Sequence, residues 1–347
     1  MVYVRPAESI FTQIRAHHFG GFAMHLVTLS NAGRPAPGVI VGDHILDLAA
    51  AAAALPGAFP KACMLPDSMR GILELGDEAL GLIRALRAQV TTGSESFRQT
   101  LRAAHVLLPT ESVTLLAPIP NPNLVLSAGL NYGEHLKEMK GTPRPPTPTA
   151  FYKSTSAIIG TGAPIVPPPD AADMLDWEGE FSAVIGRTCH RVAAADALDY
   201  VMGYTLINDV SARNWVAPVF KAQGTFPSVL AWEHNILGKQ FPTFCPMGPT
   251  IVTKDELPNP DKVYITTSLN GHVMQSACTD DLIYGVRALI EHFSKFYRLV
   301  PGDVITTGSP SGVGFGRNPQ VFMKAGDVVT VHMKEIGSLS NPIASPA

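Results

Sequence analysis

The pattern of apolar and polar residues predicts short strands over most of the chain, with helices concentrated in one segment. Near the N-terminus, apolar runs at 24–29, 38–41 and 44–48 predict three strands, with Gly42 and Asp43 in a hairpin turn. Between residues 69 and 106, apolar residues recur at helical spacing and predict one or two helices. We therefore expect a small β/α unit here.

After residue 123 the pattern is that of a larger, strand-rich domain. Three prolines at 118, 120 and 122 place a boundary at 117–123. Apolar runs predict strands at 124–127, 163–166, 179–185, 201–207, 250–252, 263–269, 303–307 and 328–333. One amphipathic helix is predicted at 282–296, with Thr279 or Asp280 as its N-cap. Many strands with few helices favour an α+β, β-rich fold with a rolled or barrel-like sheet.

The predicted organisation is an N-terminal extension at 1–23, a small N-terminal β/α domain at 24–117 and the larger domain at 118–347. The first 21 residues include Arg5, Glu8 and Arg15 and lack the apolar core of a signal peptide. No apolar run reaches the roughly 20 residues that span a bilayer. We therefore expect a cytoplasmic protein without a membrane partner.

Composition and charge point to a small-molecule partner. The net charge is −3 over 347 residues, and no lysine- or arginine-rich run provides a surface for nucleic acid. The four cysteines lie far apart without a CxxC pair, which argues against a zinc ribbon or a disulfide framework and suits a reducing compartment.

Three carboxylates form the first candidate site. Asp176, Glu178 and Glu180 alternate along a predicted strand and so share one face. Asp209 follows the predicted buried strand at 201–207. Together, Glu178, Glu180 and Asp209 offer hard oxygen ligands that suit Mg²⁺, Mn²⁺ or Ca²⁺ better than zinc. The alternatives are a solvated acidic face for the strand, and a helix cap or an ion pair with Arg213 for Asp209.

Two further segments carry candidate chemistry. In a helix predicted at 131–140 and capped by Asn131, His135 and Glu138 are three residues apart, so the carboxylate can orient the imidazole as a base. An ordinary exposed helix would show the same pair. The glycine-rich run at 305–314 follows a strand and can offer N–H groups and hydroxyls to a carboxylate or phosphate, or it is a turn without a ligand.

Taken in order, these segments resemble the fumarylacetoacetate hydrolase superfamily, in the branch of acylpyruvases and 2-hydroxyhepta-2,4-diene-1,7-dioate isomerases. The resemblance covers roughly residues 124–343. Its motifs lie at 129–135, 151–155, 176–180, 203–213, 238–241, 245–249, 269–271 and 307–314.

The resemblance implies a mixed β-roll, a homodimer and one Mg²⁺ or Mn²⁺, with Ca²⁺ as a substitute in crystals. It places Glu178, Glu180 and Asp209 at the metal and makes His135 and Glu138 a water-activating pair. Lys239 matches a lysine near the reacting carbonyl, with Lys221 as the alternative, because the segment at 214–237 is longer than usual. The residues implied to bind substrate are Lys153, Arg213, Thr307 and Ser309.

The function implied is metal-dependent hydrolysis of a carbon–carbon bond in a 2,4-dioxo acid or β-diketone, in the catabolism of aromatic compounds or sugar acids. The first alternative is a decarboxylase or isomerase of oxaloacetate-like or 2-hydroxydienoate acids. The second is a non-catalytic β-module that binds an anion. The substrate is expected to be a small keto acid, and the candidates for contacting its side chain are the segments at 142–149 and 214–237 and the N-terminal domain.

Overall fold

A computed structural model describes residues 23–54, 57, 64–139, 143–169 and 171–346. The predicted extension at 1–23 lies outside these residues apart from Ala23. In the described part of the chain, the helices are all too short or too polar to cross a bilayer.

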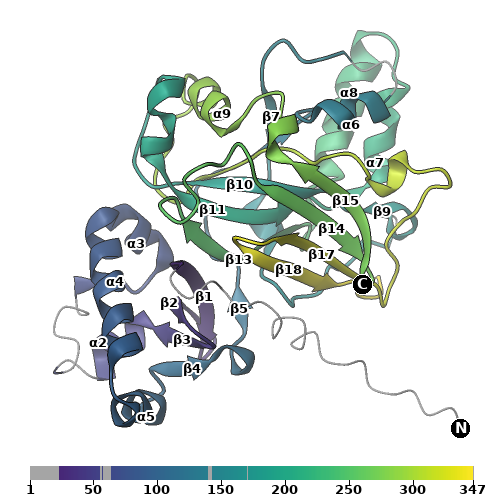
Figure 1. The fold of residues 1–347 in the computed structure, drawn as a ribbon. Helices are drawn as coiled ribbons and strands as arrows, with labels where there is room; N and C mark the ends of the chain where they lie inside the picture. The colour runs from purple at the N-terminus through teal and green to yellow at the C-terminus, as the bar shows by residue number, and fades with distance from the viewer. Residues whose placement is uncertain (1–22, 55–56, 58–63, 140–142, 170, 347) are drawn as a thin grey trace, which may run out of the picture.

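The N-terminal part contains a four-stranded meander covered by helices (Figure 1). Its elements are β1 (His25–Asn31), β2 (Arg34–Val41), β3 (His44–Asp47), α2 (Leu48–Ala54), α3 (Met69–Leu75), α4 (Asp77–Thr92), α5 (Glu95–Ala103), β4 (Leu107–Pro109) and β5 (Leu115–Leu116). Where one or two helices were predicted there are three. Gly76, at a φ of 62°, separates α3 from α4, and the side chain of Ser94 caps α5.

The C-terminal part is rich in strands, as predicted. Its strands are β6 (Val125–Gly129), β7 (Thr149–Tyr152), β8 (Ile158–Ile159), β9 (Leu175–Asp176), β10 (Gly179–Ile185), β11 (Val201–Asn208), β12 (Ser211–Ala212), β13 (Cys245–Thr253), β14 (Tyr264–Leu269), β15 (His272–Cys278), β16 (Val304–Thr306), β17 (Val328–Met333) and β18 (Gly337–Pro342). Its helices are α6 (Gly133–Glu138), α7 (Arg213–Val216), α8 (Thr225–Leu237) and α9 (Val286–Phe293). Short 3-10 turns include η6 (Ala217–Phe220) and η7 (Thr279–Asp281). The α+β, β-rich class is confirmed.

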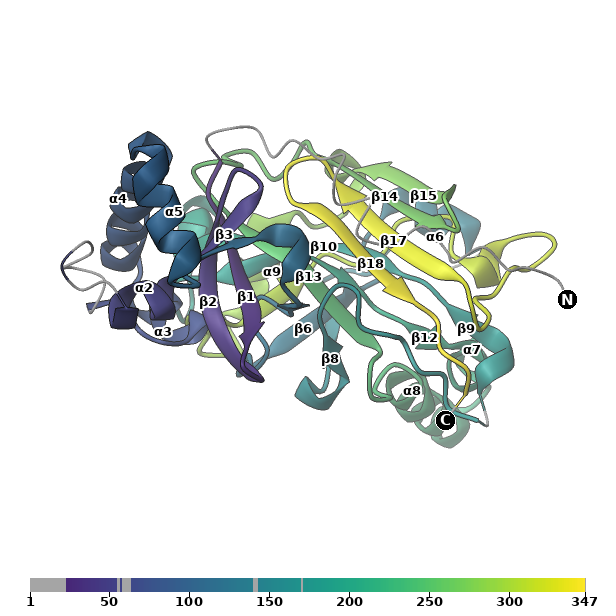
Figure 2. The ribbon, with the colours of Figure 1, turned by 90° about the horizontal axis from the view of Figure 1, so that it is seen from below.

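One large sheet runs through both parts of the molecule. Its strand order is β4-β3-β2-β1-β13-β11-β10-β16-β6-β7, and the antiparallel pairing of β1 with β13 joins His25 to Val252. Figure 2 shows β1 beside β13, with β17 and β18 next to them. A second sheet, β15-β14-β17-β18, packs against β10, β11 and β13. The predicted division at 117/118 stays a prediction, and the sheet passes across it.

Three local predictions are wrong. Tyr132, not Asn131, precedes α6, and the Asn131 amide instead donates to the carbonyl oxygens of Thr307 and Tyr284. The turn η7 is separate from α9, whose N-cap is Gly285. The strand predicted at 163–166 is reduced to a single bridge at Ile165.

Candidate metal centre and active site

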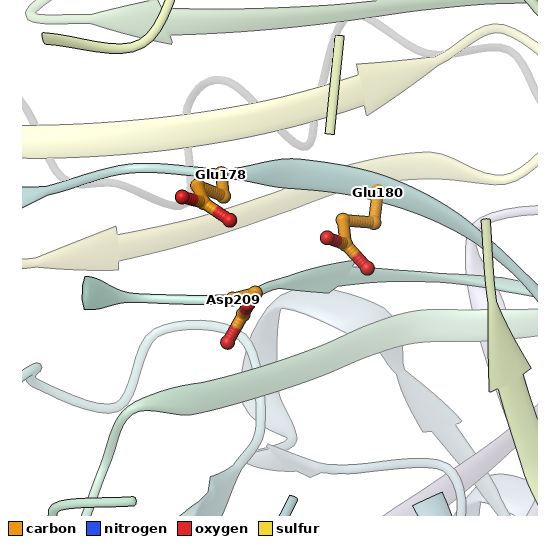
Figure 3. Close-up of side chains that lie close together, drawn as sticks. All are labelled: Glu178, Glu180 and Asp209. Carbon is orange, nitrogen blue, oxygen red and sulfur yellow. The ribbon is translucent and has the colours of Figure 1, made fainter. Parts of the chain in front are cut away.

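Three carboxylates meet where β10 begins and β11 ends. Because these strands pair antiparallel, with Gly179 opposite Asn208, Glu178 before β10 lies beside Asp209 after β11. One oxygen each from Glu178, Glu180 and Asp209 lies within 4.8 Å of the others. Figure 3 shows Glu178 and Glu180 on one strand segment and Asp209 on its neighbour. The sequence thus correctly anticipates that these three side chains converge.

Three cations surround this carboxylate cluster. The Nζ atom of Lys239 lies 2.8 Å from Oε2 of Glu178 and 2.6 Å from Oδ2 of Asp209. The Nζ atom of Lys153 lies 2.7 Å from Oδ1 of Asp209. Nη2 of Arg213 lies 2.6 Å from Oε1 of Glu178, as an ion pair rather than an aligned hydrogen bond. Asp209 therefore pairs with two lysines, and the alternative pairing with Arg213 is not what the structure shows.

Glu180 is the carboxylate without a cationic partner among the described residues. It is buried, and its Oε2 accepts hydrogen bonds from the hydroxyls of Ser127 and Thr306. Burial, together with the charge of Asp209, raises the pKa of Glu180 well above its ordinary value. A bound cation would oppose this rise, because it binds the ionised carboxylate.

The residues present fit a divalent metal ion. Three carboxylates without histidine or cysteine form a donor set of hard oxygens, which Mg²⁺ and Mn²⁺ prefer. Glu180 also lacks a cationic partner among the described residues, so a metal ion would be the positive charge that its ionised form needs.

The ionisation states of the paired groups follow from their surroundings. Burial would raise the pKa of Glu178, but Lys239 and Arg213 outweigh it and bring that pKa to about 2. Burial would lower the pKa of Lys239, but Asp209 and Glu178 raise it above the ordinary lysine value. Glu178 is therefore an anion and Lys239 an ammonium at neutral pH.

Asp176 has a role that strand alternation did not predict. β9 ends at Asp176 and β10 begins at Gly179, so the regular alternation is interrupted between them. The Asp176 carboxylate accepts from Nε of Arg213 at 2.7 Å and from the backbone N–H groups of Gly314 and Phe315 at 2.7 and 2.9 Å. It thus positions Arg213, which in turn contacts Glu178.

His135 and Glu138 form the predicted pair on α6. Nδ1 of His135 lies 3.0 Å from Oε2 of Glu138, and that carboxylate also accepts from the N–H of Gly312 at 3.2 Å. Burial would raise the pKa of Glu138, but the hydrogen bond with His135 and that from Gly312 lower it. An anionic Glu138 fixes the imidazole through Nδ1 and leaves Nε2 for proton transfer.

A cavity of about 290 Å³ brings the carboxylates and the histidine together. Its polar lining consists of His135, Thr149, Glu178, Glu180, Asp209, Arg213, Asn235, Lys239 and Ser309. Lys153 and Thr307 lie behind this wall: the Lys153 ammonium is fully enclosed, and Thr307 donates to the carbonyl of Phe181. Lys221 lines a separate groove, so Lys239 is the lysine at the carboxylates.

Two polar side chains that the sequence did not single out support the site. Gln275 donates to Oγ of Ser309 at 2.8 Å and accepts from the N–H of Gly179 at 3.1 Å. Asn208 accepts from the N–H of Glu178 at 2.9 Å. Asn208 lies beside Asp209 in the 203–213 motif, which was a usable signal, whereas Gln275 lies outside every motif.

A protein-family model matches the strand-rich part of the chain. Residues 124–344 match the model of the fumarylacetoacetate (FAA) hydrolase C-terminal domain. The chain belongs to the fumarylacetoacetate hydrolase family. This confirms the resemblance on which the predicted site residues were based, while the role of each residue stays a prediction.

Curated relatives of this family member extend over most of its length. Oxaloacetate tautomerase fahd2, mitochondrial, of Xenopus laevis is 37% identical over 325 residues, covering 92% of this chain and 90% of that protein. Oxaloacetate tautomerase FAHD2A, mitochondrial, of Homo sapiens is 38% identical over 280 residues, covering 80% of each.

Solved structures of the family share the fold. Fumarylacetoacetate hydrolase from psychrophilic Exiguobacterium antarcticum aligns with a TM-score of 0.70 at 31% identity, covering 93% of this chain and 100% of that one. Maleylpyruvate hydrolase from Sphingobium sp. SYK-6, in complex with manganese(II) ion and pyruvate, aligns with a TM-score of 0.65 at 26% identity, with the same coverage.

Proposed function

We propose that this protein is a divalent-metal-dependent tautomerase that interconverts the keto and enol forms of an oxaloacetate-like 2-oxo acid. The observation that carries the proposal is that His135, which Glu138 orients, lines the same cavity as the three carboxylates. The names of the relatives in Xenopus and in human favour this activity over the carbon–carbon hydrolysis first inferred from the sequence. Isomerisation of an oxaloacetate-like acid was part of the first alternative there, beside decarboxylation.

Glu178, Glu180 and Asp209 would hold the metal ion. When bound, Mg²⁺ or Mn²⁺ supplies Lewis acidity, which makes the C–H next to a 2-oxo group more acidic. The manganese in the maleylpyruvate hydrolase structure supports a metal of this kind.

The protein's own groups would move the proton. Nε2 of His135 takes a proton from C3, and Glu138 stabilises the resulting imidazolium through Nδ1–H. The Lys239 ammonium donates a hydrogen bond to the oxygen on which negative charge develops. Transfer of this proton from Nε2 of His135 to the oxygen on C2 gives the enol, and the reverse transfers, from that oxygen to His135 and from His135 to C3, regenerate the keto form. The same base could activate water, which is why hydrolysis has to be tested beside tautomerisation.

The test is a tautomerisation assay on purified protein. The enol absorbance of oxaloacetate is followed with Mg²⁺ or Mn²⁺, then with EDTA, and then after the metal is restored. We expect a metal-dependent rate above that of buffer, without release of pyruvate. No rate on oxaloacetate, combined with metal-dependent formation of pyruvate and a carboxylic acid from an acylpyruvate, would return the assignment to hydrolysis.

The His135→Ala variant tests the base. Removing a positioned general base costs about 10²–10⁴-fold in rate, and we expect kcat to fall by this amount while the affinity for Mn²⁺ is retained. Lys137→Ala is the matched control, since Lys137 is an exposed residue of the same helix. Normal turnover by His135→Ala would remove His135 from the proposed mechanism.

A further inference from the structure

The cavity has a second wall that the chemistry proposed above does not use. This apolar wall consists of Leu130, Met139, Val216, Val219, Phe220 and Trp232. Four of its members, Val216, Val219, Phe220 and Trp232, come from α7, η6 and α8, in the segment at 214–237 that the sequence marked as unusually long. The other two, Leu130 and Met139, flank α6, so no member comes from the strands beside the carboxylates.

The aromatic residues of the apolar wall are exposed although they border a cavity. Phe220 is 54% exposed and Trp232 is 46% exposed. Large apolar side chains gathered at the mouth of a pocket mark a surface that a ligand covers. Because both rings line the same cavity as Glu178 and Asp209, one small molecule can reach the carboxylates and the rings together.

Phe220 is held in place by contacts that lead back to the charged site. Its ring stacks on that of Phe315, with centroids 6.1 Å apart and an interplanar angle of 20°. Phe315 also lies 5.8 Å from Cζ of Arg213, and its N–H donates to Asp176. These contacts fix the position of Phe220 relative to the carboxylates.

The permanently charged cations in the described lining of the cavity are already paired. Arg213 contacts Asp176 and Glu178. Lys239 contacts Glu178 and Asp209, and in the chemistry proposed above it is the donor to the reacting oxygen. A second carboxylate on the substrate would have to compete with these pairs and would lie against aromatic rings. An apolar substituent in the same place would instead remove exposed aromatic surface from water.

We propose that the preferred substrate is a 2-oxo acid whose end remote from the oxo acid group is apolar, with Trp232 and Phe220 as the residues that select it. The inference rests on the proposed tautomerase function and narrows its substrate class. A ring or branched chain at C3 would contact the apolar wall, while the oxo acid group lies at the carboxylates. Oxaloacetate itself would be accepted as a poorer substrate.

The experiment compares two keto acids that differ at this end. Phenylpyruvate carries a phenyl group where oxaloacetate carries a carboxylate, and the enol form of each absorbs in the ultraviolet. With the Mg²⁺-loaded full chain we expect kcat/KM for phenylpyruvate to exceed that for oxaloacetate by about tenfold or more, a usual size for discrimination by an apolar pocket. Trp232→Ala and Phe220→Ala should each lower this ratio by about tenfold.

Phe226→Ala is the matched control. Phe226 is another aromatic residue of α8, 77% exposed, and is not among the residues that line the cavity. This variant should leave the ratio as it is in the unmodified protein. A ratio that favours oxaloacetate, or one that Trp232→Ala and Phe226→Ala change equally, would overturn the substrate inference and leave the tautomerase proposal intact.

If the protein turns over neither acid, the tautomerase proposal is wrong. Calorimetric measurement of binding then tests the substrate inference by itself. Binding of phenylpyruvate to the Mg²⁺-loaded protein should still be tighter than that of oxaloacetate, weaken about tenfold in Trp232→Ala, and show a more negative heat-capacity change. Equal affinities in the unmodified protein and Trp232→Ala would then overturn the substrate inference as well.

Discussion

Buried ion pairs set the positions of the candidate metal ligands at the scale of single residues. Glu178 contacts Lys239 and Arg213, and Arg213 is itself held by Asp176, which is fully buried. Removing one partner of such a pair leaves an uncompensated charge in the interior and costs about 3–5 kcal/mol. Asp176 therefore helps to fix the position of the Glu178 carboxylate, because Arg213 contacts both.

We expect Asp176→Asn to weaken both folding and metal binding. The change leaves Arg213 with Glu178 as its remaining carboxylate, so the guanidinium competes more strongly with a metal ion for that side chain. The free energy of unfolding should fall by about 3 kcal/mol, and the Kd for Mn²⁺ should rise about tenfold, measured by denaturant titration and calorimetry. Asp173→Asn, which changes an exposed partner of Asn214, should alter neither. A destabilised Asp176→Asn with unchanged Mn²⁺ affinity would show that Asp176 does not act on the metal site.

At the scale of elements, the glycine-rich loop after β16 holds the end of α6. The N–H of Gly312 donates to Glu138, and a Cβ on Gly316 would lie 2.7 Å from Oε1 of the same carboxylate. Gly312 has a φ of 99°, and a Cβ there would lie 2.2 Å from the carbonyl oxygen of Met274. Only glycine allows this close approach, so the loop and the His135–Glu138 pair are positioned together.

Gly312→Ala is expected to reduce activity through Glu138. The backbone has to shift away from Met274, which moves the Gly312 N–H and loosens the orientation of His135. We expect kcat to fall at least tenfold and the protein to lose about 2–3 kcal/mol of stability. Gly326→Ala is the matched control, because Gly326 has a φ of 91° with open space around it, and should cost about 1 kcal/mol without loss of kcat. Equal kcat values for the two variants would mean that the loop does not act on the catalytic pair.

Whether a contact can be predicted from the sequence depends on how far apart its residues lie along the chain. The convergence of Glu178, Glu180 and Asp209 was predictable because β10 and β11 are neighbours in both sequence and sheet. The contacts of Asn131 were not, since Tyr284 and Thr307 lie 153 and 176 positions away. The prediction that Asp176 shares one strand face with Glu178 and Glu180 was wrong. The break between β9 and β10 cannot be recognised from the alternation of side chains in the sequence.

The whole molecule is joined by a sheet that the apolar pattern alone could not have revealed. β1 pairs with β13 across more than two hundred residues, and one core cluster contains Leu26, Leu80 and Val304. Because the N-terminal part shares hydrogen bonds and core with the strands beside the site, we expect both parts to unfold together. Binding of a metal ion at Glu178, Glu180 and Asp209 should therefore raise a single Tm for the entire chain.

This stabilisation by metal should depend on pH through Glu180. Burial and the charge of Asp209 raise its pKa well above the roughly 4.3 of an exposed glutamate. Between these two pKa values the folded metal-free protein holds a proton that the unfolded chain has lost, so the contribution of Glu180 to stability is complete below about pH 4.3 and is lost as pH rises through the folded pKa. A bound cation favours the ionised form of Glu180, because it binds the carboxylate and not the protonated acid.

We therefore expect the same concentration of Mg²⁺ to raise Tm more at pH 8 than at pH 6, measured by scanning calorimetry against EDTA-treated protein. Because the pKa of Glu180 is raised, less of the metal-free protein carries a proton on this carboxyl at pH 8 than at pH 6, and the cation has to displace that proton where it is present. Glu180→Gln should reduce the gain and remove its dependence on pH, whereas Glu233→Gln, at an exposed position of α8, should behave as the unmodified protein. An equal gain at both pH values would mean that Glu180 is already ionised at pH 6. A full gain in Glu180→Gln would remove Glu180 from the ligand set and leave Glu178 and Asp209 to hold the metal.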